Sequence, residues 1–155
     1  WSGGIEGRAD GSITFVTEGE RLTPFESPRI GLCVLYGGEA LIGQPYEAIH
    51  VDGRRKREHF PRLISPQQFA REFTSFRTTT RENVGVLVVT PGADMNIEDQ
   101  RNYGDSSYKA FIEGSERHSQ RLDIAFDTSP IVVQRNSPPP PVSRSLPVVK
   151  FPPAL

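Results

Sequence analysis

The stretch SPQQFAREFTSF (residues 65–76) decides which fold class the sequence predicts, because it carries the strongest helix pattern in the chain. It opens with an N-cap hydroxyl, a proline at the first helical position and a glutamine three residues after the cap: Ser65, Pro66 and Gln68. Three phenylalanines then recur at i, i+4 and i+7, on one face of a helix: Phe69, Phe73 and Phe76. This pattern predicts an amphipathic helix over residues 65–76.

The rest of the chain is dominated by strand patterns. A second helix is predicted over SSYKAFIEGSERH (residues 106–118), which would place Tyr108, Phe111 and Ile112 on one face. Stretches rich in β-branched or aromatic residues and bounded by turn residues predict strands at 12–17, 29–36, 46–51, 83–90, 121–126 and 131–134. We therefore expect an α+β fold: a mostly antiparallel β-sheet or β-sandwich with two helices packed on one side.

The length of 155 residues fits one domain, which we place at residues 12–135. Residues 1–11 include Ile5-Glu6-Gly7-Arg8, a pattern used as an engineered cleavage site, and are expected to be a flexible lead-in. Residues 136–155 are rich in proline, which favours an extended tail or linker over packed structure.

Composition argues against nucleic-acid binding, metal binding and a membrane-spanning helix. The formal net charge of −1 gives no overall attraction for nucleic acid, so we expect no nucleic-acid partner. One cysteine cannot form an internal disulfide, and the three histidines are too scattered to form a metal site. No apolar run approaches the roughly 18 residues that a membrane-spanning helix needs. We expect neither a metal nor another cofactor.

The sharpest candidate site pairs Cys33 with His50. Strand alternation places Cys33 away from the main apolar face, beside Gly31, whose missing side chain would leave open space. If the strands 29–36 and 46–51 pair so that opposed residue numbers sum to 83, His50 lies across from Cys33. A neighbouring imidazolium lowers the pKa of a thiol, which predicts a nucleophile with its acid and base.

The stretch SPRIGLCVLYGGEALIGQPYEAIHVDG (residues 27–53) resembles the Cys-His glutamine deamidases, which include the catalytic domain of the cytotoxic necrotizing factors and the chemoreceptor deamidases. Ser27 stands six residues before the cysteine, and His50 stands seventeen after it. The resemblance implies that Cys33 forms a thioester, that His50 moves protons and that Ser27 is the third catalytic residue. It also implies a toxin or effector that is secreted or delivered into host cells.

The same resemblance implies a protein substrate, such as a small GTPase or a translation factor, and a larger protein that carries the domain. The run RRKR (residues 54–57) follows His50 and predicts recognition of an acidic or phosphorylated partner, with Gly31, Arg54 and Arg55 as substrate-binding residues. A solvated loop and a processing site are alternative interpretations of the run.

Two other functions remain open. One is a non-enzymatic β-rich binding or secretion-associated module with a buried structural cysteine. The other is an ADP-ribosyltransferase toxin domain, which would use Arg29, the stretch SFRTTT (residues 75–80) and the pair Glu113 and Glu116.

Overall fold

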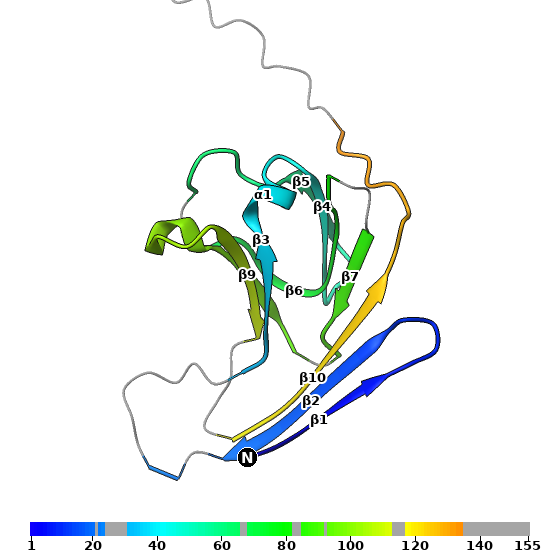
Figure 1. Cartoon of the computed structure of the whole chain (residues 1–155), viewed down its shortest axis with the longest axis vertical. Coiled ribbons are helices and arrows are strands. Elements are labelled where there is room, and N and C mark those ends of the chain that lie inside the picture. The colour runs from blue at the N-terminus through cyan, green and yellow to red at the C-terminus, as the bar shows by residue number, and fades with distance from the viewer. Residues whose placement is uncertain are drawn as a thin grey trace, which may run out of the picture.

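The fold is a β-sheet that curls on itself (Figure 1). The computed structural model describes residues 1–20, 22–23, 31–65, 68–81, 85–91, 93–112 and 117–134. Within these ranges the strands are β1 (Ser2–Gly7), β2 (Ile13–Glu20), β3 (Cys33–Gly37), β4 (Pro45–His50), β5 (Arg55–His59), β6 (Gln68–Thr79), β7 (Gly85–Val89), β8 (Met95–Asp99), β9 (Ser107–Ile112) and β10 (Arg117–Phe126). The helical elements are α1 (Gly38–Leu41) and the 3-10 turn η1 (Gln100–Tyr103), and no described helix has the length and apolar character to cross a membrane.

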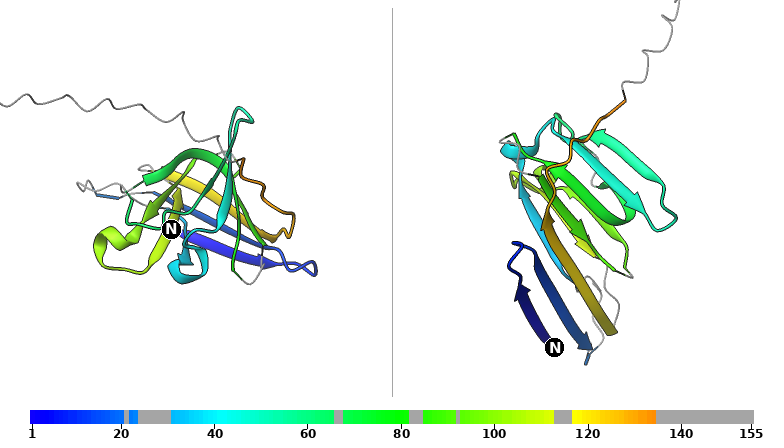
Figure 2. Two further views of the ribbon diagram at one scale, coloured as in Figure 1. Left: turned by 90° about the horizontal axis from the view of Figure 1, so that it is seen from above. Right: turned by 90° about the vertical axis from the view of Figure 1, so that its right-hand side faces the viewer.

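All pairings in the sheet are antiparallel, and the main path runs β1-β2-β10-β7-β6-β8-β9-β3. Strand β4 pairs with β5 and with β6, so β6 contacts β4, β7 and β8. Strands β3 to β9 curl around a common interior, whereas β1, β2 and the adjoining part of β10 extend beyond it (Figure 2). The predicted mostly antiparallel sheet is confirmed.

The predicted helix over residues 65–76 is wrong, because Gln68–Thr79 is the strand β6. Its pairing register with β8 shifts between Gln68 and Ala70 and again between Ala70 and Phe73. Its register with β4 shifts between Phe73 and Ser75. Each shift is a β-bulge, which gives β6 one residue more than its partner strand at that point and bends the strand.

These bulges explain why the sequence of β6 resembles a helix. In a regular strand, side chains three residues apart point to opposite faces. A bulge adds one residue between Ala70 and Phe73, and another adds one between Phe73 and Phe76, so all three side chains are buried in the core. A spacing of three residues, which is typical of a helix face, is produced here by an irregular strand.

The second predicted helix is also wrong where the structure describes it. Ser107–Ile112 is the strand β9, and its alternate residues Tyr108, Ala110 and Ile112 are buried in the core. Residues 113–116, the middle of the predicted helix, lie outside the described residues. The α+β class fails because both aromatic-rich stretches are strands, and the two expected helices are replaced by single turns at other positions.

Most of the predicted strands are present. The predictions at 12–17, 46–51, 83–90 and 121–126 overlap β2, β4, β7 and β10, and β3 covers the second half of 29–36. Residues 131–134 form no strand. The expected lead-in is instead part of the sheet, because β1 pairs with β2 along its whole length. Residues 136–155, the predicted tail, lie outside the described residues.

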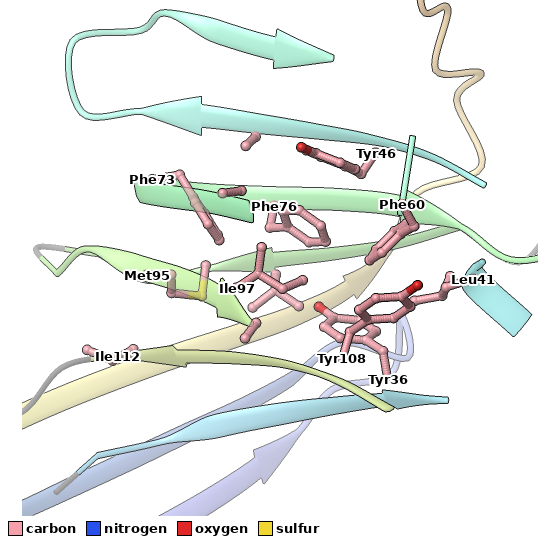
Figure 3. Packing of buried hydrophobic residues seen from close by; sticks show 14 of the residues in the cluster. Tyr36, Leu41, Tyr46, Phe60, Phe73, Phe76, Met95, Ile97, Tyr108 and Ile112 are labelled. Carbon is pink, nitrogen blue, oxygen red and sulfur yellow. The ribbon is translucent and has the colours of Figure 1, made fainter. Parts of the chain in front are cut away.

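Aromatic side chains from separate strands fill the core (Figure 3). Phe76 of β6 lies at its centre, with ring centroids 5.3 Å from Tyr46 and from Phe73, 5.9 Å from Phe60 and 6.1 Å from Tyr36. Edge-to-face and offset contacts of this kind add to the free energy gained by burying the rings. The bulged strand β6 therefore joins the β4 side of the curled sheet to the β9 and β3 side.

Candidate functional site

The structure separates Cys33 from His50. Cys33 begins β3 and pairs with Phe111 of β9, whereas His50 ends β4 and pairs with Phe73 of β6. Along the sheet, β6, β8 and β9 lie between β4 and β3, so the assumed pairing of the two strands is wrong. The expected face of Cys33 is correct, since its side chain is exposed while the side chain of Tyr36 enters the core.

His50 holds a bulge of β6. Its Nδ1 lies 2.8 Å from the carbonyl oxygen of Glu72, and a carbonyl only accepts, so the imidazole donates through Nδ1. Glu72 has a φ of 57°, an unfavourable value for a residue with a side chain, and its N–H donates to Asn96 Oδ1 at 3.1 Å. His50 and Asn96 thus stabilise the strained residue from its two neighbouring strands.

The other predicted site residues are also placed differently. A Cβ atom added at Gly31 would clash with the carbonyl oxygen of Ile112 and would lie 2.9 Å from Gln120 Oε1, so protein atoms occupy the space that the missing side chain leaves. Arg54 is paired with Asp52 on the exposed turn between β4 and β5. Ser27 lies outside the described residues, as do the Arg29 and Glu113 of the ADP-ribosyltransferase hypothesis.

Arg55, in contrast, belongs to a charged cluster that the sequence reasoning did not recognise. The cluster is centred on Glu47 of β4, whose side chain is 2% exposed and which stands directly across from Arg57 on β5 and from Arg77 on β6. Glu47 Oε2 accepts from Arg57 Nε at 2.5 Å, and Oε1 accepts from Arg55 Nη1 and Arg77 Nη2 at 3.3 Å each. Three guanidinium groups therefore surround one carboxylate.

These contacts determine the charge of Glu47. Burial alone would raise the pKa of its carboxyl group, but the hydrogen bond from Arg57 and the charges of Arg57, Arg77 and Arg55 lower the pKa below its ordinary value. The carboxylate stays ionised near neutral pH. Arg77 also donates to Asp127 Oδ2 and to the carbonyl oxygen of Ser129, which fixes the segment after β10 beside the cluster.

An open pocket of about 430 Å³ lies over this cluster, between β5 and the segment after β10. Its lining is mostly polar and comprises Arg55, Arg57, Glu58, His59 and residues 132–134. The arginine side chains are 55% and 42% exposed at Arg55 and Arg57, and Arg57 uses only its Nε toward Glu47. Within the described part of the chain the terminal nitrogens of Arg57 make no hydrogen bond, so they remain donors for a small polar ligand.

Sequence signals for this cluster were present. Within RRKR (residues 54–57), strand alternation places Arg55 and Arg57 on one face, and Glu47 interrupts an otherwise apolar strand. A buried glutamate opposite alternating arginines indicates a cross-strand ion pair. The prediction chose Arg54 and Arg55 as the first cations after His50 and did not recognise Arg55–His59 as a strand, so it missed Arg57.

A second buried carboxylate, Asp99, organises the loop after β5. Asp99 is fully buried and accepts from the N–H of Ser65 and from the backbone and guanidinium of Arg101. Burial would raise the pKa of Asp99, but these donors lower it. Arg101 also donates to the carbonyl oxygens of residues 61–63, so this pair holds the loop. No described group of three or more His, Cys, Asp and Glu residues could hold a metal ion.

Comparisons with known proteins identify the family. The family model described as the N-terminal domain of D-apionate lactonase matches residues 1–118. The D-apionate lactonase of Brucella anthropi is 30% identical over 154 residues, which cover 92% of this chain and 25% of the relative. The chain thus spans about a quarter of the length of that relative. No solved structure matches the chain.

These comparisons correct the predictions of identity. The resemblance to Cys-His glutamine deamidases is wrong, and so are the toxin and ADP-ribosyltransferase functions, the protein substrate and the delivery into host cells. The buried structural cysteine of the binding-module alternative is also wrong, because Cys33 is exposed. The relative is an enzyme named for a small sugar acid, and the predicted class of hydrolase agrees with a lactonase. The short Cys-His stretch misled because two residue types at a plausible spacing do not fix which strands pair. The chain belongs to the family of D-apionate lactonase N-terminal domains.

Proposed function

We propose that this chain is the N-terminal domain of a lactonase that opens a lactone of D-apionate to the free acid. The observation that carries the proposal is the 30% identity to a D-apionate lactonase across 92% of the chain. In this reaction the oxygen of water bonds to the lactone carbonyl carbon, the ring C–O bond breaks, and the leaving oxygen takes a proton. The proton on the leaving oxygen comes from the water, and the second proton of the water is released to solvent as the new acid ionises to a carboxylate.

Three arginine-paired carboxylates, those of Glu47, Asp99 and Asp123, fit binding and structural roles better than proton transfer. A general acid or base works best with a pKa near the operating pH. Burial would raise the pKa of Glu47, Asp99 and Asp123, but their arginine partners lower each of the three. We therefore assign these carboxylates to holding arginines and loops in place.

The pocket over Glu47 suits the product of the reaction. A guanidinium offers paired N–H donors that match the two oxygens of a carboxylate, and the terminal nitrogens of Arg57 are available for this contact. Glu47 fixes the arginine side chains, which lowers the entropic cost of binding. We propose that Arg55 and Arg57 bind the carboxylate of the sugar acid, which retains Arg55 as a ligand-binding residue.

The function is tested by assaying the complete protein that carries this domain. Purified protein is incubated with a D-apionate lactone, and acid release is measured by titration at constant pH. We expect acceleration by on the order of a millionfold or more over the reaction in buffer, at the lower end of enzymatic rate enhancements. An unsubstituted five-membered lactone of the same ring size is the control and should react far more slowly. A rate equal to that in buffer would refute the proposed lactonase activity.

A further inference from the structure

One face of the outer strands β1 and β2 is apolar and continuous with the core. Ile5 of β1 stands across from Phe15 of β2, which stands across from Leu122 of β10. Residues in register across an antiparallel sheet share a face. Leu122 is buried in the core and Phe15 packs against it, whereas Ile5, at the outer edge, is 73% exposed.

The opposite face of the same strands is polar. Arg121 and Asp123 of β10 form an ion pair there, and Thr14 of β2 donates a hydrogen bond to Asp123 at 2.6 Å. On β1, Glu6 pairs with Arg8. A sheet with one polar and one apolar face is expected where the polar side meets water and the apolar side meets another structure.

The apolar face is hollowed by two adjoining grooves of about 430 and 350 Å³, which share Trp1, Thr17 and Leu32. Leu32, which lines both grooves, is held to the sheet by two hydrogen bonds. Its N–H donates to Gln120 Oε1 at 2.8 Å, and its carbonyl accepts from the N–H of Ile112. In the described lining, Glu20 is the charged residue. The surface is therefore shaped for an apolar occupant.

We infer that this apolar face, formed by Ile5, Phe15, Thr17, Leu32 and Trp1, docks onto an apolar surface of the lactonase chain that follows this domain. The inference rests on the proposed function. The relative has about four times the length of the aligned region, so a lactonase of that size has a large further part for this domain to contact. The uncovered side chains continue the core of the domain out to its surface, as the apolar centre of an obligate interface does.

Paired cysteine probes on one strand test the inference. Ile5→Cys places a thiol on the apolar face, and Glu6→Cys places one on the polar face one residue away. Both positions are largely exposed in the domain, 73% for Ile5 and 68% for the Glu6 side chain. The variants are made in a Cys33→Ser background, because Cys33 is exposed and would react. Maleimide labelling rates are measured in the 155-residue chain and in the complete lactonase.

We expect both thiols to react at similar rates in the 155-residue chain, and Ile5→Cys alone to react at least about tenfold more slowly in the complete protein, an opening cost of about 1.4 kcal/mol. Equal rates for the two thiols in the complete protein would overturn the inference. Concentration-dependent protection of Ile5→Cys in the 155-residue chain would also overturn it, in favour of a second copy as occupant. Lactone hydrolysis by the same preparations is scored separately, so that a loss of the proposed function and a loss of the docking face are distinguished.

Discussion

Replacing Phe76 with alanine is expected to lower the free energy of unfolding by about 3–5 kcal/mol, the range for phenylalanine truncation in a packed core. The side chain of Phe76 is fully buried, and its ring contacts Tyr36, Tyr46, Phe60 and Phe73. Because these rings come from β3, β4 and β6 and from Phe60 just after β5, the cavity could not close without moving the sheet. Urea unfolding followed by circular dichroism measures the loss.

The matched control is Phe126→Ala. Phe126 lies at the end of β10 and is 67% exposed, so its truncation should change the free energy of unfolding by no more than about 0.5 kcal/mol. If Phe76→Ala destabilised the protein no more than Phe126→Ala, then residue 76 would not occupy the centre of the core. That result would contradict the placement of β6 as a bulged strand.

Replacing Glu47 with glutamine is expected to lower the free energy of unfolding by about 2–3 kcal/mol near neutral pH. Removing one partner of a buried ion pair is strongly destabilising, because the remaining charge loses its compensation. The loss is moderated here because Arg55 and Arg57 are about half exposed and water screens them. Arg77, at 12% exposure, keeps Asp127 as its one ionic partner among the described residues.

This effect of Glu47→Gln depends on pH in a defined direction. The pKa of Glu47 is lower in the folded protein than its ordinary value of 4.5. The stabilisation is therefore complete above pH 4.5 and is lost as the pH falls through the lower folded-state pKa. Urea unfolding at about pH 7 and about pH 3 should show the difference between wild type and variant shrinking in acid. If wild type and Glu47→Gln differed in free energy of unfolding by the same amount at both pH values, Glu47 would not be an ion-paired carboxylate. The control variant is Asp52→Asn, on the exposed turn.

Several regular strands could be predicted from this sequence, whereas β9 and the irregular strand β6 were predicted as helices and β1, β5 and β8 were missed. The stretches 46–51 and 83–90 carry β-branched and aromatic residues between turn residues, and both are strands. Residues 65–76 have capping residues and a helical spacing of phenylalanines, so local pattern alone favours a helix. The bulges of β6 are set by its pairing with β4 and β8 and by His50 and Asn96 at Glu72, which are contacts distant in sequence.

The candidate site, too, depends on contacts between residues distant in sequence, which a local pattern does not predict. Strand alternation correctly placed Cys33 outside the core, because facing depends only on the strand itself. Whether Cys33 meets His50 depends on which strands pair, and the chain between them does not determine that. Predicting the cluster around Glu47 also requires knowing which strands pair, since Arg77 comes from β6, thirty positions away along the chain. The exposure of Cys33 could therefore be predicted from one strand, whereas the cluster around Glu47, to which three strands contribute, was not recognised.

In the function proposed here, the arginine pocket of this domain binds the carboxylate of the sugar acid. Calorimetric titration of the 155-residue chain with D-apionate tests it most directly, with Arg57→Gln as the variant and Arg54→Gln, on the exposed turn, as the matched control. We expect saturable binding that Arg57→Gln weakens by about tenfold or more, the cost of one charge-assisted contact, and that Arg54→Gln leaves unchanged. Equal affinity of wild type and Arg57→Gln, or no saturable binding at millimolar acid, would contradict the claim.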